Sequence, residues 1–330
     1  MLKGLFILNA DACEKIYGPA ECEEIARLVE LVAPPQTSRS VAEDPSVLRR
    51  VEVILSGWGG PRMDEAFLAA APELKAVFYG AGSIRGVVTD AFWDRSILIT
   101  SAYGANAVPV AEYTLSQILF CLKRGWYYVL AGRREGKRPA RAAVPGAYGS
   151  TVGIISLGMI GRRVCELLKA FDVEVLAYDP YATQELAAGL NVKLVSLEEI
   201  FRRCDVVSLH TPRLNETIGM ITGAHFASMK RDSSFINTAR GAVVREAEMV
   251  EVLRRRPDVC AVLDVTDPEP PEPGSPLYTL PNVVLTPHIA GSMDGECRRM
   301  GRYMVEELRR YANGEPLRWG IDREKAATLA

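Results

Sequence analysis

The sequence lacks several features that would place it in a specialised structural class. It has no run of about 18 uncharged apolar residues, which a membrane-spanning helix needs. Its first apolar run, Leu5 to Leu8, is too short for the core of a signal peptide. Its 27 Gly and 20 Pro form no low-complexity tract, so a disordered or fibrous chain is not expected.

Metal-binding and disulfide patterns are missing as well. None of the seven cysteines lies in a CxxC pair, and the chain has only three histidines. Thiols scattered through apolar segments are typical of reduced cysteines rather than of a disulfide scaffold or a zinc site. We therefore expect a cytoplasmic protein with no bound metal.

Charge of one sign is not in excess. Lys and Arg number 39 against 41 Asp and Glu, which gives a formal net charge of -2. This balance predicts no general attraction to nucleic acid or to an anionic membrane. What the chain does have is 330 residues, 48% of them hydrophobic and 24% charged, which is enough for about two globular domains.

Short β-rich runs alternate with helical patterns, which predicts parallel sheets covered by helices. In the first hundred residues we expect helices near 20–32 and 64–70. A helix beginning near Pro109 would lead into a second series, and residues 293–313 read as a long helix. The expected strands are 5–8, 51–55, 75–79 and 97–100, then 152–155, 175–178, 192–194, 206–209, 234–237, 259–263 and 283–285. The second series describes a doubly wound, Rossmann-type sheet.

A glycine-rich turn follows the first strand of the second series. It has the GxGxxG spacing with serine at the first glycine position, and it reads Ser156-Leu157-Gly158-Met159-Ile160-Gly161. Small residues there let a pyrophosphate reach the N–H groups at a helix N-terminus, and the Cβ of Ser156 is expected to strain the turn or shift the loop. Asp179 lies 18 residues beyond Gly161, at the end of the next strand. An acid there accepts the ribose hydroxyls of NAD and repels the 2′-phosphate of NADP, although a solvated turn residue is the alternative.

The carboxyl ends of parallel strands lie at one edge of a sheet, where ligands bind. Reading those ends gives a guanidinium, an imidazole and several acids. They are Ser156, Asp179, His210-Thr211-Pro212, Thr238-Ala239-Arg240, Asp264 and His288, with Glu269 in the loop after Asp264. A cation that binds a 2-oxo acid and a proton donor beside it are what carbonyl reduction requires.

Five ordered motifs resemble the D-isomer-specific 2-hydroxyacid dehydrogenase family. They are VGIISLGMIG, LHTPRLNETIGMI, SFINTARGAVV, DVTDPEP and PHIAG. The resemblance covers nearly the whole chain, strongly from Ala105 to Gly291. It implies an NAD-dependent enzyme that interconverts a D-2-hydroxy acid and its 2-oxo acid.

The resemblance also assigns roles to matching residues. Arg240 would bind the substrate carboxylate and carbonyl, and His288 would exchange a proton with the carbonyl oxygen. Glu269 would hold the other imidazole nitrogen, and Asp264 the nicotinamide carboxamide. His210 would line the cofactor crevice without transferring a proton.

Two loops of the first hundred residues bear on the substrate. Backbone amides at Ala81 and Gly82 are expected to bind the substrate carboxylate. The family pattern is broken directly after them, at Ser83-Ile84-Arg85, so the substrate's identity stays open. Trp58 either walls the substrate pocket or packs in the core.

We therefore predict an α/β protein of two Rossmann-like or flavodoxin-like domains with parallel sheets, the nucleotide domain being inserted into the substrate domain. Residues 1–101 and 292–330 would form the discontinuous substrate-binding domain, and residues 102–291 the NAD-binding Rossmann domain. The domains are expected to close over the substrate. The basic stretch Arg133–Arg141 reads as a solvated arm or, as the resemblance implies, part of a homodimer contact.

Two other functions fit the same fold. One is a non-catalytic NAD(H)-sensing interaction protein, which Ser156 and the unusual Ser83-Ile84-Arg85 segment keep open. The other is a relative that oxidises a different small anion, such as formate or phosphite. The presence of Arg240, Glu269 and His288 favours the enzyme.

Overall fold

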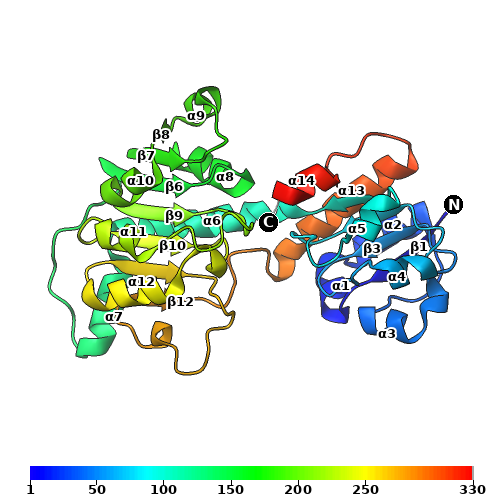
Figure 1. Ribbon diagram of the computed structural model, residues 1–330, viewed down its shortest axis with the longest axis horizontal. Helices are drawn as coiled ribbons and strands as arrows, with labels where there is room; N and C mark the ends of the chain where they lie inside the picture. The colour runs from blue at the N-terminus through cyan, green and yellow to red at the C-terminus, as the bar shows by residue number, and fades with distance from the viewer. Residues whose placement is uncertain (329–330) are drawn as a thin grey trace. The chain divides into compact units, whose positions relative to one another are not determined.

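The computed structural model describes residues 1–328 and divides the chain into two compact units. Unit 1 comprises Met1–Asn106 and the chain from Ser292 onward, and unit 2 comprises Ala107–Gly291. Each unit has a sheet of its own with helices on both faces (Figure 1). The predicted α/β class with two Rossmann-like sheets is confirmed. The first crossing between units falls at 106/107 rather than 101/102, because Ala102 and Ala105 pack in the core of unit 1.

Unit 1 contains a six-stranded sheet in the order β13-β5-β4-β3-β1-β2. Its strands are β1 (Leu2–Ile7), β2 (Val29–Leu31), β3 (Val53–Ser56), β4 (Ala76–Tyr79), β5 (Leu98–Ser101) and β13 (Gly320–Ile321). Five strands run parallel, but β13 pairs antiparallel with β5. The sheet is thus parallel as predicted, and β13 adds one short antiparallel strand at its edge, where the chain returns after α13 (Cys297–Ala312).

Helices cover both faces of this sheet. On one face α1 (Ala10–Ile16), α2 (Pro19–Leu28) and α13 (Cys297–Ala312) enclose a core that contains Ile16, Ile25 and Met300. On the other face α3 (Ser38–Glu43), α4 (Glu65–Ala70) and α5 (Asp90–Asp94) bury Val41, Leu68 and Phe92. The remaining helices of unit 1 are η1 (Pro45–Leu48), η4 (Asp294–Glu296) and α14 (Arg323–Thr328). The long helix predicted over residues 293–313 is α13, and it packs on the sheet of unit 1 as expected.

Two helix predictions need correction. The helix expected over 20–32 ends at Leu28, because buried Val29 turns extended and starts the edge strand β2. The helix expected to begin near Pro109 is α6 (Tyr103–Leu122), which contains Pro109 in its interior. It begins earlier because the hydroxyl of Ser101 accepts the Tyr103 N–H at 3.2 Å and satisfies an amide of the first turn.

Unit 2 contains a seven-stranded sheet in the order β12-β11-β10-β9-β6-β7-β8, with every neighbouring pair parallel. Its strands are β6 (Ser150–Ile155), β7 (Val173–Tyr178), β8 (Lys193–Leu194), β9 (Val206–Leu209), β10 (Ser234–Asn237), β11 (Cys260–Leu263) and β12 (Val283–Leu285). The chain runs outward from β6 to β8 and then resumes at β9, on the other side of β6. The topological switch point therefore lies between β6 and β9, where such sheets bind ligands.

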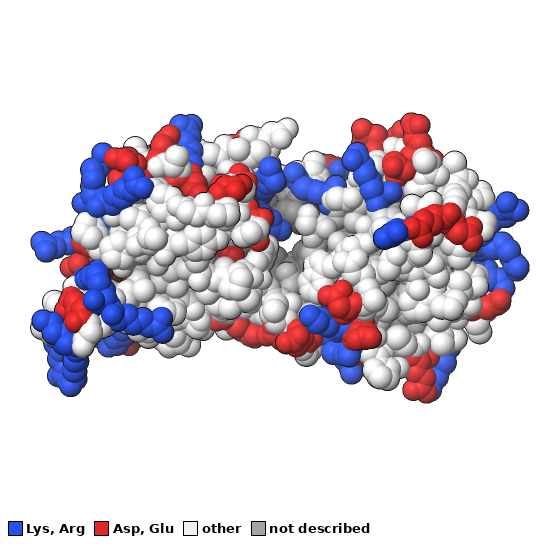
Figure 2. All heavy atoms as spheres, turned by 90° about the horizontal axis from the view of Figure 1, so that it is seen from below, with Lys and Arg blue, Asp and Glu red and all other residues white. Residues whose placement is uncertain are grey.

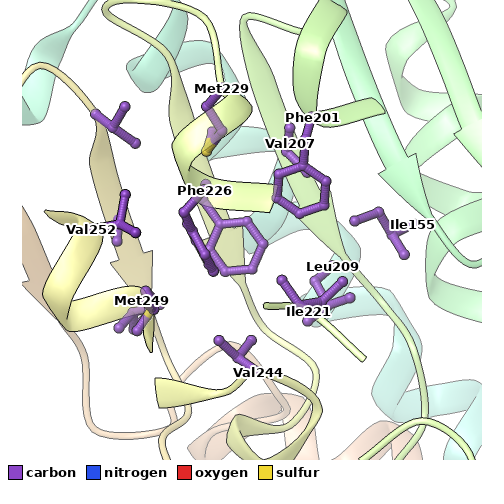
Figure 3. Close-up of a cluster of buried hydrophobic side chains, with 14 of the residues drawn as sticks. Ile155, Phe201, Val207, Leu209, Ile221, Phe226, Met229, Val244, Met249 and Val252 are labelled. Atoms are coloured by element: carbon purple, nitrogen blue, oxygen red, sulfur yellow. The ribbon is translucent and has the colours of Figure 1, made fainter. Parts of the chain in front are cut away.

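Two apolar cores hold the helices of unit 2 on its sheet. One lies under α10 (Leu197–Arg203), α11 (Gly223–Ser228) and α12 (Glu246–Arg255) and is shown in Figure 3. There Phe226 and Phe235 meet edge to face at 4.9 Å. The other core lies under α6, α8 (Met159–Leu168) and α9 (Gln184–Leu190). The remaining helices are α7 (Gly125–Glu135), η2 (Gly241–Val243) and η3 (Pro276–Tyr278).

The surface carries both signs of charge. Figure 2 shows Lys and Arg side chains interspersed with Asp and Glu on the visible face. Within residues 1–328, no helix combines the length and apolar character needed to cross a membrane. All seven cysteines are free thiols.

Candidate functional site

The strand register of unit 2 brings the predicted residues together at one edge. Ile155 of β6 is level with Tyr178 of β7 and Leu209 of β9, so the residues that follow these strands are neighbours. The same holds across β10, β11 and β12, where Asn237, Leu263 and Leu285 are level. The edge therefore carries the residues after each strand, namely Ser156, Asp179, His210, Thr238, Asp264 and Thr286.

Ser156 adopts the backbone conformation that the glycine pattern requires. Its φ is 76°, in the left-handed region that favours glycine. Its hydroxyl lies 2.7 Å from the hydroxyl of Thr211, the second residue after β9. The expected strain at this position is thus present, and a hydrogen bond across the switch point accompanies it.

The other two glycines serve different purposes. Gly158 is the N-cap of α8, and a Cβ built on it would point into open space, with nothing within 4 Å. A Cβ on Gly161 would lie 2.1 Å from the carbonyl oxygen of Ser156, so only glycine lets α8 pack this closely. Gly158 leaves room for a ligand, and Gly161 closes the helix on the turn.

Asp179 is tied to the same turn. One carboxylate oxygen accepts the Leu157 N–H at 2.7 Å, and the other accepts the Tyr181 N–H at 2.8 Å. A carboxylate has about four acceptor positions, so Asp179 keeps capacity for two hydroxyls. The open N-terminus of α8 beside this acid fits a pyrophosphate and a ribose, which are the parts of NAD that the sequence predicted to bind here. Met159 and Ile160 form the first turn of that helix, and Met159 is exposed.

His288 and Glu269 form a direct pair. The Nδ1 atom of His288 lies 2.5 Å from a carboxylate oxygen of Glu269, and both side chains are roughly half exposed. Because Nδ1 faces the acid, Nε2 is the ring nitrogen that can meet a substrate. His288 has a φ of 56°, so its backbone is held in the left-handed region.

Asp264 holds the turn that presents His288. This buried carboxylate accepts the Thr286 hydroxyl at 2.5 Å and the amides of Ile289 and Ala290, each at 2.9 Å. Three of about four acceptor positions are used, which leaves one for the expected carboxamide. Thr286 also meets the hydroxyl of Tyr113 at 3.0 Å. Sequence reasoning missed Thr286 and Tyr113, because neither belongs to a residue type or spacing that marks a site.

The loop that carries Arg240 is organised by a buried amide. The Asn237 side chain accepts the Ala239 N–H at 2.9 Å and donates to the Arg240 carbonyl at 3.2 Å. Thr238 is tied to α6 through the hydroxyl of Thr114, at 3.1 Å. The Nη1 atom of Arg240 donates to the Ala239 carbonyl at 2.6 Å.

Gly241 brings the Arg240 loop against the loop that leads to Glu269. A Cβ on Gly241 would lie 2.0 Å from the carbonyl carbon of Thr266. The two backbones therefore touch, so the loop that carries Arg240 is in direct contact with the loop that leads to Glu269.

His210 is buried and neutral. Its Nε2 atom lies 3.0 Å from the Ser208 hydroxyl, and burial lowers the pKa of His210 to about 3. Such a ring does not exchange protons near neutral pH, and its place along the cofactor crevice stays a prediction. Thr211 and Pro212 follow it, and the Pro212 carbonyl accepts the Thr217 hydroxyl at 2.6 Å.

His225 has a structural role. Its Nδ1 atom accepts the Thr222 N–H at 3.0 Å at the start of α11, and its ring packs on Phe201 with centroids 4.9 Å apart. Burial lowers the pKa of this histidine as well. Within residues 1–328, no group of three or more His, Cys, Asp or Glu side chains could hold a metal ion.

The predicted substrate residues of unit 1 lie at the carboxyl end of its sheet. Ala81 and Gly82 follow β4, and their carbonyl oxygens accept the Ser101 hydroxyl. Trp58 follows β3 and is 38% exposed, so it is not a core residue. A role in substrate binding stays a prediction for all three residues.

A comparison with family models matches residues 117–290 to the D-isomer specific 2-hydroxyacid dehydrogenase, NAD binding domain. This range contains every residue of the unit 2 site except Tyr113 and Thr114.

Among curated relatives, the D-3-phosphoglycerate dehydrogenase of Archaeoglobus fulgidus is 34% identical over 79% of this chain and 50% of its own length. The (S)-sulfolactate dehydrogenase of Chromohalobacter salexigens is 34% identical over 76% of this chain and 81% of its own. The chain spans about half the length of the first relatives it matches.

Among solved structures, an NAD-complexed D-isomer specific 2-hydroxyacid dehydrogenase from Lactobacillus delbrueckii ssp. bulgaricus has a TM-score of 0.80 at 22% identity. The match covers 97% of this chain and 100% of that one. At this identity the likeness concerns the fold.

Proposed function

Because this chain belongs to the D-isomer specific 2-hydroxyacid dehydrogenase family and carries its NAD binding domain, we propose that it is an NAD-dependent oxidoreductase. It would interconvert a D-2-hydroxy acid and its 2-oxo acid. The observation that carries the proposal is the His288–Glu269 pair, 2.5 Å apart on the sheet edge that also carries the open N-terminus of α8.

Two features of the chain would hold the cofactor. The N–H groups at the start of α8, with Gly158 leaving the approach open, would bind the pyrophosphate. Asp179 would accept the ribose hydroxyls, and its negative charge selects NAD over NADP. When bound, NAD(H) supplies or accepts the hydride. His210, Thr211, Pro212, Thr238 and Ala239 are proposed to line the rest of the crevice.

His288 and Arg240 would act on the substrate. With Nδ1 held by Glu269, the ring of His288 is oriented so that Nε2 gives a proton to the carbonyl oxygen in reduction and removes it in oxidation. The guanidinium of Arg240 would bind the carboxylate and polarise the carbonyl through its planar set of donors.

The relatives suggest which substrates to try first. Both curated enzymes are named for 2-hydroxy acids that bear a second anionic group, a phosphate or a sulfonate. A panel of 2-oxo acids should therefore include 3-phosphohydroxypyruvate and 3-sulfopyruvate beside pyruvate and glyoxylate, each with NADH and with NADPH. We expect turnover of at least one acid, with NADH preferred.

The matched variant is His288→Asn. Asparagine tolerates the left-handed backbone of residue 288 better than alanine does, so the turn is kept while the acid–base group is lost. Turnover should fall about 10²- to 10⁴-fold while the Kd of NADH stays the same. NADH binding without turnover of any acid by the unmodified protein would favour an NAD-sensing role instead. Equal losses of turnover and NADH affinity would remove the role given to His288.

We further propose that the protein is a homodimer. The end of α6, the helix α7 and the segment after it leave large apolar side chains exposed, which are Phe120, Tyr127, Val129, Val144 and Tyr148. Such a group of apolar side chains on one segment is typical of an interface between copies. Sedimentation equilibrium would measure the mass, and a monomer at micromolar concentration would contradict the proposal.

A further inference from the structure

We infer that Tyr113, a residue of α6 far from His288 in sequence, is a positioning residue for the proposed acid–base histidine. The inference rests on the proposed function. A chain of hydrogen bonds runs from the Tyr113 hydroxyl to Thr286 at 3.0 Å, and from Thr286 to the Asp264 carboxylate at 2.5 Å. The carboxylate then binds the turn that contains His288.

The direction of these bonds follows from their chemistry. A carboxylate only accepts hydrogen bonds, so the Thr286 hydroxyl must donate its single proton to Asp264. The oxygen of Thr286 is then an acceptor, and the Tyr113 hydroxyl is the donor to it. Tyr113 thereby fixes the orientation of the Thr286 hydroxyl toward the carboxylate. The bond from Thr286 to Asp264 is charge-assisted, and such bonds are stronger than hydrogen bonds between neutral groups.

Asp264 binds the backbone amides of His288 and of the two residues that follow it. Its two carboxylate oxygens bind the amides of Ile289 and Ala290 at 2.9 Å, and the Asp264 carbonyl accepts the His288 N–H at 3.1 Å. These contacts hold His288 at a φ of 56°, a conformation that costs free energy and persists only where the surrounding structure determines it. A small rotation of the carboxylate would therefore displace the imidazole from Glu269.

Tyr113 is well placed to act as the fixed end of this chain. It lies on the twenty-residue helix α6, which is held in a core of unit 2 by Ala111 before it and Ile118 after it. Its side chain is half buried, and burial raises the pKa of its hydroxyl, so the group stays protonated and remains a donor.

Three variants test the inference. Tyr113→Phe removes one hydroxyl and should lower kcat about 2- to 10-fold, the effect of one neutral hydrogen bond. Thr286→Val removes the donor to the carboxylate and should lower kcat about 10- to 100-fold. Thr286→Ser keeps the hydroxyl and should restore kcat to within about twofold of the unmodified protein. In each variant the KM of the 2-oxo acid and the Kd of NADH should change less than about twofold.

The double variant separates positioning from a general structural effect. Because Tyr113 acts through Thr286, adding Tyr113→Phe to Thr286→Val should lower kcat no further. Additive losses would overturn the inference. So would a Thr286→Ser protein as slow as Thr286→Val, or a loss that appears in KM and NADH affinity instead of kcat.

A second readout needs no turnover, so it decides the inference even if no substrate is found and the proposed function fails. The amides of Ile289 and Ala290 should exchange with deuterium at least about tenfold faster in Thr286→Val than in the unmodified protein. They should exchange a few-fold faster in Tyr113→Phe. Unchanged exchange at both amides would overturn the inference.

Discussion

The two glycines at the start of α8 should respond in opposite ways to the same substitution. In Gly158→Ala the new methyl group enters open space, whereas in Gly161→Ala it would lie 2.1 Å from a carbonyl oxygen. The first change should therefore spare the fold and obstruct the cofactor. The second should damage the fold itself. The two substituted glycines lie three positions apart in the same turn, so each variant is the control for the other.

The magnitudes follow from the local geometry. Alanine at 158 gains about 0.4–1 kcal/mol by restricting the unfolded chain, but it is a poorer N-cap than glycine by a similar amount. The free energy of unfolding should therefore stay within about 0.5 kcal/mol of the unmodified protein. The same methyl in the path of a pyrophosphate should weaken NADH binding by about 1–3 kcal/mol, or roughly 5- to 150-fold. Alanine at 161 forces α8 away from β6 and should cost about 1–3 kcal/mol of stability or more.

Urea unfolding measures the stability of both variants, and fluorescence titration measures the Kd of NADH. Unchanged NADH affinity in Gly158→Ala would mean that the pyrophosphate does not pass over this residue, and the assignment of the cofactor site would fall. A stability of Gly161→Ala equal to that of Gly158→Ala would contradict the close packing that the structure shows.

Two further predictions concern the same edge of the sheet. Ser156→Ala keeps the left-handed strain and loses the bond to Thr211, whereas Ser156→Gly relieves the strain, so the glycine variant should be the more stable by about 0.5–1 kcal/mol in urea unfolding. An alanine variant as stable as the glycine variant would contradict this. For His210, burial lowers the pKa to about 3, below the unfolded value of about 6.5, so the unfolded chain binds the extra proton between these values. The stability that His210 contributes is complete above about pH 6.5 and is lost as the pH falls toward 3. A pH series should therefore show a shallower acid slope in His210→Asn, by up to about 1.4 kcal/mol per pH unit, and equal slopes would show that the ring is not buried neutral.

Much of the fold and of the candidate site follows from local sequence patterns. The alternation of β-rich runs and helical periodicity predicts the two sheets, and the turn from Ser156 to Gly161 predicts where α8 begins. Reading the residue after each strand then gathers Asp179, Arg240 and His288 on one edge. This works because parallel strands end at the same edge whatever their order in the sheet.

Other features depend on pairing that no local pattern encodes. Residues 29–31 continue a helical period, but they become strand β2 because Val29 aligns with Leu2 at the edge of a sheet. Likewise β13 pairs antiparallel with β5, from more than two hundred residues away.

The sequence by itself determined which chemical groups stand at the ends of the strands of unit 2, because strand ends and glycine turns are local properties of the chain. Only the tertiary structure decided how those groups are held. The link from Tyr113 to Thr286 spans 173 residues, and that from Thr286 to Asp264 spans 22. Such bonds form because packing brings α6, β11 and β12 together, and ordinary residues such as tyrosine and threonine carry no mark of that meeting in the sequence.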